Sequence, residues 1–159
     1  MSHANISVFV PHLGCPNRCS FCDQRSITGR HIAPRPKDVI DAVRAAVTSA
    51  NYDPENTEIA FFGGSFTAIN REYMEQLLQS AYKHVKNGIV KGIRVSTRPD
   101  AINDEILAVL SRYGVTTIEL GAQSMLDSVL VANHRGHTAD DVRTAARLIK
   151  ERGFNLGLQ

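Results

Sequence analysis

Residues 14–22 read Gly-Cys-Pro-Asn-Arg-Cys-Ser-Phe-Cys and contain every cysteine of the 159-residue chain. Cys15, Cys19 and Cys22 follow the spacing C-x₃-C-x₂-C, so three thiolates of one loop can converge on a single metal centre. A structural zinc site uses four protein ligands, whereas three protein ligands leave one coordination position open for chemistry. An iron–sulfur cubane held by three thiolates likewise leaves one iron free. The stretch predicts a metal centre; the alternatives are a zinc site completed by His12 and three unrelated thiols.

The composition of the whole chain excludes several classes of protein. Apolar content of 43% and charged content of 21% are ordinary for one globular domain with a hydrophobic core. A net charge of +2 is too small to indicate nucleic-acid or membrane binding. Cysteines that are odd in number and clustered do not fit a secreted disulfide framework. Residues 1–5 have no positively charged leader, and no long apolar run follows, so we expect no membrane span and a cytoplasmic location.

Outward from the cysteine loop, predicted strands and helices alternate. The β-branched and aromatic runs predict strands at 6–10, 58–62, 92–97, 116–120 and 154–158. Apolar residues at helical spacing predict helices that start at Pro36 and end before Tyr52, cover 71–85, follow an Asn103 cap up to Gly114, and cover 139–152. This order predicts an α/β fold with a parallel sheet and right-handed crossovers. An open doubly wound sheet and a partial (β/α) barrel both fit the pattern.

Candidate binding residues follow the predicted strands at their carboxyl ends, where both architectures bind ligands. Gly63 and Gly64 follow the second strand, and a tight turn explains them equally well. Ser96 and Thr97 end the third strand, where hydroxyls bind ribose or simply satisfy loop backbone. Gln123 follows the fourth strand.

Four charged or basic residues lie near these segments, and each has an expected role. For Arg98 and Asp100, the alternative to a contact with a ligand is a structural ion pair with each other. The residue pattern alone favours surface-loop positions for Arg135 and His137.

The sequence resembles the radical S-adenosylmethionine (radical SAM) superfamily. The resemblance rests on the cysteine spacing with an aromatic residue before the last cysteine, and on Gly-Gly-Ser-Phe, Thr-Arg-Pro-Asp, Glu-Leu-Gly-Ala-Gln-Ser and Arg-Gly-His-Thr. These motifs are similar to the branch that includes the Elongator catalytic subunit and oxygen-independent coproporphyrinogen oxidase. The resemblance implies a partial (β/α) barrel, truncated after about four βα units plus a fifth strand. Residues 1–159 would then be the N-terminal part of a core of usually six units, lacking its C-terminal barrel segment.

The same resemblance implies a set of cofactor contacts. In the family, three cysteines bind three irons of a [4Fe–4S] cluster, and the amino and carboxylate groups of S-adenosylmethionine chelate the fourth. The implied cluster ligands are Cys15, Cys19 and Cys22. The implied contacts of S-adenosylmethionine are Phe21, beside the adenosine; Gly63 and Gly64, at the amino group; Ser96 and Thr97, at the ribose or methionyl part; and Gln123 and Arg135. Ser65 stands where many members have glutamate, so no acidic contact is expected there.

The resemblance also implies the activity. An external one-electron reductant of the flavodoxin or ferredoxin type would feed reductive cleavage of S-adenosylmethionine to a 5′-deoxyadenosyl radical, which abstracts hydrogen from a substrate. Nothing in the sequence selects transfer RNA, a porphyrin precursor or a small metabolite as that substrate. The alternatives are a non-catalytic zinc- or RNA-binding module that uses the three cysteines and His12, and an inactive fragment.

Overall fold

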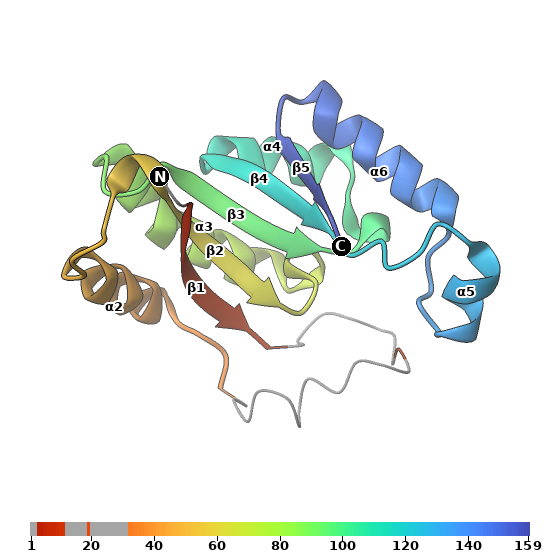
Figure 1. Cartoon of the computed structure of the whole chain (residues 1–159), viewed down its shortest axis with the longest axis horizontal. Helices are drawn as coiled ribbons and strands as arrows, with labels where there is room; N and C mark the ends of the chain where they lie inside the picture. Colours follow the sequence, from red (N-terminus) through yellow and green to blue (C-terminus); the bar gives the residue numbers. More distant parts are fainter. Residues whose placement is uncertain (1–2, 12–18, 20–31) are drawn as a thin grey trace.

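The computed structural model describes residues 3–11, 19 and 32–159, and it contains one parallel sheet. The sheet consists of five strands in the order β1-β2-β3-β4-β5 (Figure 1). The strands are β1 (Ala4–Val10), β2 (Thr57–Gly63), β3 (Gly92–Thr97), β4 (Val115–Leu120) and β5 (Asn155–Leu158). The helices are α2 (Pro36–Val47), α3 (Arg71–Lys86), α4 (Asp104–Arg112), α5 (Asp127–Ala132) and α6 (Ala139–Glu151). Three single 3₁₀ turns complete the list: η1 (Pro54–Asn56), η2 (Phe66–Ala68) and η3 (Pro99–Ala101).

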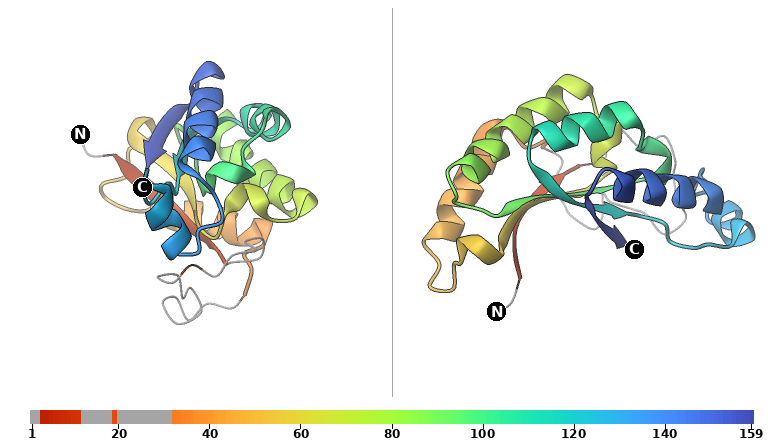
Figure 2. Two further views of the ribbon diagram at one scale, coloured as in Figure 1. Left: turned by 90° about the vertical axis from the view of Figure 1, so that its right-hand side faces the viewer. Right: turned by 90° about the horizontal axis from the view of Figure 1, so that it is seen from above.

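The sequential strand order decides between the two predicted architectures. A doubly wound sheet reverses its strand order at a switch point, and its helices therefore cover both faces. Here each strand pairs with the next one along the chain, so crossovers of the usual hand place the helices on one face. Figure 2 shows α3, α4 and α6 on the same side of a curved sheet. The fold is the partial (β/α) barrel, and the predicted fold class is confirmed.

The hydrophobic core lies between the sheet and these helices. Strand side chains alternate between the two faces, and the apolar ones point toward the helices. Fully buried core side chains include Ile59 and Phe61 of β2, Ile93 and Val95 of β3, Ile118 of β4, Leu77 and Leu78 of α3, and Leu107 and Leu110 of α4. Polar side chains take the alternate positions, so the opposite, inner face of the sheet carries charge.

Local signals explain most element ends. The Asn103 side chain accepts a hydrogen bond from the Ile106 backbone N–H at 2.9 Å and starts α4, as predicted. Thr138 and Asp141 form a capping box at the start of α6. The short helix α5 was not predicted, because it has only six residues and no side-chain cap at Leu126. None of the helices in the described ranges combines the length and the apolar character that crossing a membrane requires.

Candidate cofactor site

The turn after β2 depends on glycine at position 63. Gly63 has φ +117°, and a Cβ there would overlap the carbonyl oxygen of Val10 and the ring of Phe9. Gly64 N donates to the Val10 carbonyl oxygen at 2.9 Å, which ties the ends of β1 and β2 together. Gly63 and Gly64 therefore form a tight turn after β2. The contact of these glycines with a cofactor amino group stays a prediction.

A buried chain of hydroxyls joins this turn to the end of β3. Thr97 Oγ1 lies 2.8 Å from Ser65 Oγ and 2.6 Å from Thr67 Oγ1, and Thr67 Oγ1 donates to the Ala101 carbonyl oxygen at 2.8 Å. Ser65 Oγ accepts from Arg98 N at 3.1 Å. Thr97 is 5% exposed, so its hydroxyl holds β3 against the turn after β2. Its predicted contact with a cofactor is not tested by these interactions.

Ser96 lies on the inner face of the sheet, beside an ion-pair network that the sequence analysis did not identify. Its hydroxyl donates to Glu119 Oε2 at 3.1 Å. Arg94 bonds Glu119 Oε1 through Nη1 at 2.6 Å and Glu58 Oε2 through Nε at 3.0 Å. We call Glu58, Arg94, Ser96 and Glu119 the inner-face ladder. The signal that finds it is the buried–polar alternation within 92–97 and 116–120, which puts these residues on one face.

The charges of the ladder are stabilised by one another. Burial alone would raise the pKa of Glu58, but the hydrogen bond from Thr116 and the charge of Arg94 outweigh burial and hold that pKa below its usual value. Burial acts against the charged form of Arg94 as well, yet bonding to Glu119 and Glu58 raises its pKa. Glu58 and Arg94 are therefore both charged at neutral pH.

Gln123 and Arg135 come together above Gly121. A Cβ at Gly121 would lie 3.3 Å from both Arg135 Nη2 and Gln123 Nε2, so glycine leaves room for the two side chains. Arg135 Nη2 donates to the Gly121 carbonyl oxygen at 2.5 Å. Gln123 adopts φ +64°, and its N–H donates to the Gln159 carbonyl oxygen at 2.7 Å. Both side chains line a cavity of about 270 Å³, together with Ser124, Val129, Leu130 and Asn133.

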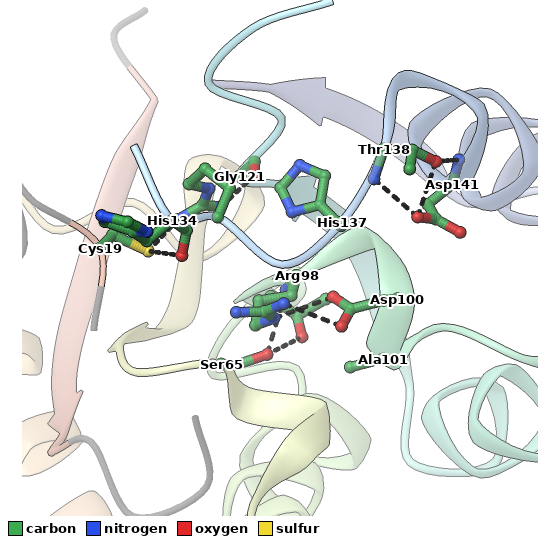
Figure 3. Close-up of polar contacts among 12 residues, drawn as sticks. Cys19, Ser65, Arg98, Asp100, Ala101, Gly121, His134, His137, Thr138 and Asp141 are labelled. Atoms are coloured by element: carbon green, nitrogen blue, oxygen red, sulfur yellow. Dashed lines mark hydrogen bonds and ion pairs between the residues drawn. The ribbon is translucent and has the colours of Figure 1, made fainter. Parts of the chain in front are cut away.

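Cys19 approaches the same arginine. The Cys19 thiol lies 3.7 Å from the His134 carbonyl oxygen, and Arg135 Nη1 donates to its sulfur at 3.5 Å (Figure 3). Cys19 is 7% exposed, and the Arg135 guanidinium lies beside its sulfur. The predicted ligands Cys15 and Cys22, the alternative ligand His12 and the predicted adenosine contact Phe21 lie outside the described residues.

Three further residues of this region have structural roles. Arg98 and Asp100 form a two-pronged ion pair, Nε–Oδ1 and Nη2–Oδ2 both at 2.8 Å, as the alternative reading expected (Figure 3). His137 Nε2 lies 3.2 Å from the Ala122 carbonyl oxygen, and burial lowers the pKa of its imidazole. Arg135 and His137 are only 8% and 5% exposed. The surface-loop expectation for these two residues is therefore wrong, because the loop after α5 folds back over the sheet edge.

Comparison with known proteins agrees with this geometry. A family model described as the radical SAM superfamily matches residues 9–158. The chain belongs to the radical SAM superfamily.

Individual radical SAM relatives match at low identity. The chain is 28% identical over 159 residues to the oxygen-independent coproporphyrinogen-III oxidase-like protein HemZ of Bacillus subtilis, covering 94% of this chain and 31% of HemZ. It is 22% identical over 182 residues to a tRNA uridine(34) acetyltransferase of Dehalococcoides mccartyi, covering 95% of this chain and 39% of that protein. This radical SAM chain therefore spans about a third of the length of these curated relatives.

A solved structure shares the fold. The archaeal Elp3 of Methanocaldococcus infernus superposes with a TM-score of 0.68 at 18% identity, covering 99% of this chain and 38% of that protein. At this identity the likeness concerns the fold alone. The HemZ and Elp3 matches agree with the predicted branch of the superfamily.

Proposed function

We propose that this chain is the cofactor-binding part of a [4Fe–4S]- and S-adenosylmethionine-dependent radical enzyme. The observation that carries the proposal is the position of Arg135 at the sheet edge. Its guanidinium donates to Cys19 Sγ and to the Gly121 carbonyl oxygen, and Gln123 lines the same cavity. A guanidinium is suited to bind a carboxylate through two hydrogen bonds. A thiol, a carboxylate-binding group and a glycine cradle thus share one site, which fits a cluster that carries an amino-acid cofactor.

Different residues would hold the cluster and S-adenosylmethionine. Cys15, Cys19 and Cys22 would hold the cluster, which supplies the electron for reductive cleavage of S-adenosylmethionine to a 5′-deoxyadenosyl radical when both are bound. Arg135 would bind the cofactor carboxylate and Gln123 a neighbouring polar group, because both line the same cavity. The described residues then orient the cofactor, and burial of Arg135 and Cys19 excludes water from the reacting edge.

The cofactor contacts predicted for the other residues complete the proposal. Gly63 and Gly64 would contact the cofactor amino group, and Phe21 the adenosine. Ser96 would contact the ribose or methionyl part, and its position on the inner face supports this role. The Thr97 hydroxyl is engaged by Ser65 and Thr67, so the structure supports a contact from Ser96 more than one from Thr97.

For the substrate we propose RNA, with transfer RNA modification as the first candidate. The support is the similarity to a protein named tRNA uridine(34) acetyltransferase. An external reductant of the flavodoxin or ferredoxin type would supply electrons in the cytoplasm. A C-terminal barrel segment beyond β5 would complete the substrate-binding side.

Anaerobic reconstitution with iron and sulfide tests the proposal. We expect a brown protein with iron and sulfide bound, a reduced-cluster EPR signal, and a change of that signal when S-adenosylmethionine is added. Replacing Cys15, Cys19 or Cys22 by alanine should each abolish the signal. Ser20→Ala, in the same loop, is the matched control and should retain it. A colourless protein with bound zinc, or a signal that survives every cysteine replacement, contradicts the proposal.

A further inference from the structure

We infer that Glu119 supplies the negative charge that recognises the sulfonium of S-adenosylmethionine, an inference that rests on the proposed function. Glu119 belongs to the inner-face ladder and lies one row below the site formed by Gly121, Gln123 and Arg135. No motif of the sequence assigns it a role. Three observations carry the inference: the charge balance of the ladder, the accessibility of its two acids, and the face on which Glu119 lies.

The ladder holds more negative than positive charge. Arg94 is shared between the carboxylates of Glu58 and Glu119, at 3.0 and 2.6 Å. One guanidinium thus neutralises one of two acids. His3 Nε2 lies 3.2 Å from Glu58 Oε2, at the end of the ladder away from Glu119. The ladder therefore offers a surplus negative charge to a cation.

The carboxylates of Glu58 and Glu119 differ in how accessible they are to a ligand. The Glu58 side chain is 4% exposed, and its oxygens also accept from the Thr116 and Thr117 hydroxyls at 2.6 and 3.2 Å. The Glu119 side chain is 17% exposed. Its oxygens accept one bond each from Arg94, Ser96 and Gln159, whereas a carboxylate has about four acceptor sites. Glu119 is the acid that a ligand can still approach.

Glu119 lies on the face of the sheet that leads to the proposed cofactor site. Gly121 directly follows β4, and its N–H donates to the Thr97 carbonyl oxygen at 2.9 Å, which continues the pairing with β3. Residues two apart in extended backbone share a face, so the Glu119 side chain lies on the same face as the Gly121 position. That position is within 3.3 Å of Arg135 Nη2 and Gln123 Nε2. Glu119 pairs across the sheet with Gly157, where a Cβ would approach the Glu119 side chain to 3.0 Å. Glycine on β5 thus keeps the space around the carboxylate open.

Ligand chemistry identifies the group that this charge fits. S-adenosylmethionine carries one carboxylate, which the proposed function assigns to Arg135, and it carries a sulfonium that accepts no hydrogen bond. A permanent cation taken from water needs a nearby opposite charge. S-adenosylhomocysteine has the same groups except the methyl group, and its sulfur is neutral. Glu119 would therefore raise the affinity for the sulfonium form over the neutral thioether.

Calorimetric titration of the cluster-loaded protein with both ligands tests the inference. We expect Glu119→Gln to weaken binding of S-adenosylmethionine at least about tenfold, because a partly buried charge contact is lost. Binding of S-adenosylhomocysteine should change less than about threefold, because the lost contact involves a charge that this ligand lacks. Glu58→Gln is the comparison variant, since it removes the same amount of charge from the more buried acid, which lies farther from the cofactor site. It should lower the preference between the two ligands less than Glu119→Gln does.

Each outcome has one meaning. If Glu119→Gln weakens both ligands equally, or if Glu58→Gln lowers the preference as much, then Glu119 acts only through the packing of the ladder and the inference is wrong. The ratio of the two affinities is measured on one sample, so a loss of stability does not mimic the expected result. If the wild type carries the cluster and binds neither ligand, the proposed function fails before this inference is reached.

Discussion

The hydroxyl chain at Thr97 gives the sharpest prediction for stability. The Ala101 carbonyl only accepts, so the Thr67 hydroxyl must donate to it and accept from Thr97. Thr97 then has no proton left for Ser65, so Ser65 donates to Thr97. The backbone N–H of Arg98 in turn donates to Ser65 Oγ. The bonds therefore run in one direction from the Arg98 N–H to the Ala101 carbonyl, and Thr97 is the central member.

Thr97→Val keeps the shape of the side chain and removes the hydroxyl. Ser65 loses its acceptor and Thr67 loses its donor, and both are buried, at 6% and 7% exposed. The Ser65 O–H is left without an acceptor, which costs about 1–3 kcal/mol, and Thr67 keeps its bond to Ala101 but loses a hydrogen bond worth about 1 kcal/mol. We therefore expect a loss of roughly 2–4 kcal/mol in the free energy of unfolding. For a domain of this size the loss corresponds to a Tm lower by roughly 4–16 °C. Thr97→Ser keeps the hydroxyl and should cost only about 1 kcal/mol, for one methyl group.

Urea unfolding followed by circular dichroism measures these changes. The double variant Ser65→Ala with Thr97→Val supplies a second check, because removing the Ser65 donor first should reduce the cost of Thr97→Val by about 1 kcal/mol. If Thr97→Val unfolds at the wild-type urea concentration, the hydroxyl carries no stability and the central role of Thr97 is refuted.

Three further predictions concern the edge of the sheet, the pH and a helix end. Gly121→Ala should weaken S-adenosylmethionine binding, seen by calorimetry, and change stability by less than about 1 kcal/mol, because the new methyl requires only a small shift of the ends of two long side chains. Burial lowers the pKa of His137, so its contribution to stability is complete above the unfolded value of about 6.5 and is lost as the pH falls below it. His137→Gln should flatten this acid loss in unfolding curves recorded from about pH 7 to 5, with the remaining slope from His84, whose pKa burial also lowers. Asn103→Ala should cost about 1 kcal/mol by thermal unfolding, because the Ile106 N–H loses its cap; an unchanged Tm contradicts this role.

Most of the elements could be predicted from local signals. The β3 limits 92–97 match the expected range, and β4 and α3 differ from it by one residue at one end. Of these segments, α3 and β4 combine a clear apolar pattern with an asparagine or glycine directly after their last residue, Asn87 and Gly121. The helix α5 has neither a long period nor a cap, so no local signal separates it from a loop.

The candidate site was predictable only in part. The sequence pattern placed Gln123 at the carboxyl end of the fourth strand, and only the family resemblance assigned Arg135 to the same cofactor. The structure brings both side chains together beside Gly121. The sequence did not separate Ser96 from Thr97, although strand alternation sends them to opposite faces: Ser96 toward Glu119 and Thr97 toward Ser65. The inner-face ladder was missed because its members come from three strands that are distant in sequence.

The sequence by itself determined the metal-binding potential of the loop at 14–22 and the alternation of strands with helices, because thiol spacing and hydrophobic period are local properties of the chain. Only the tertiary structure decided that the strands follow one another in order and curve into a partial barrel. The same packing buried Arg135 beside Cys19 and gathered Glu58, Arg94 and Glu119 on one face. The physical reason is that pairing between parallel strands and the burial of charge depend on residues far apart in sequence, whose proximity no local pattern records.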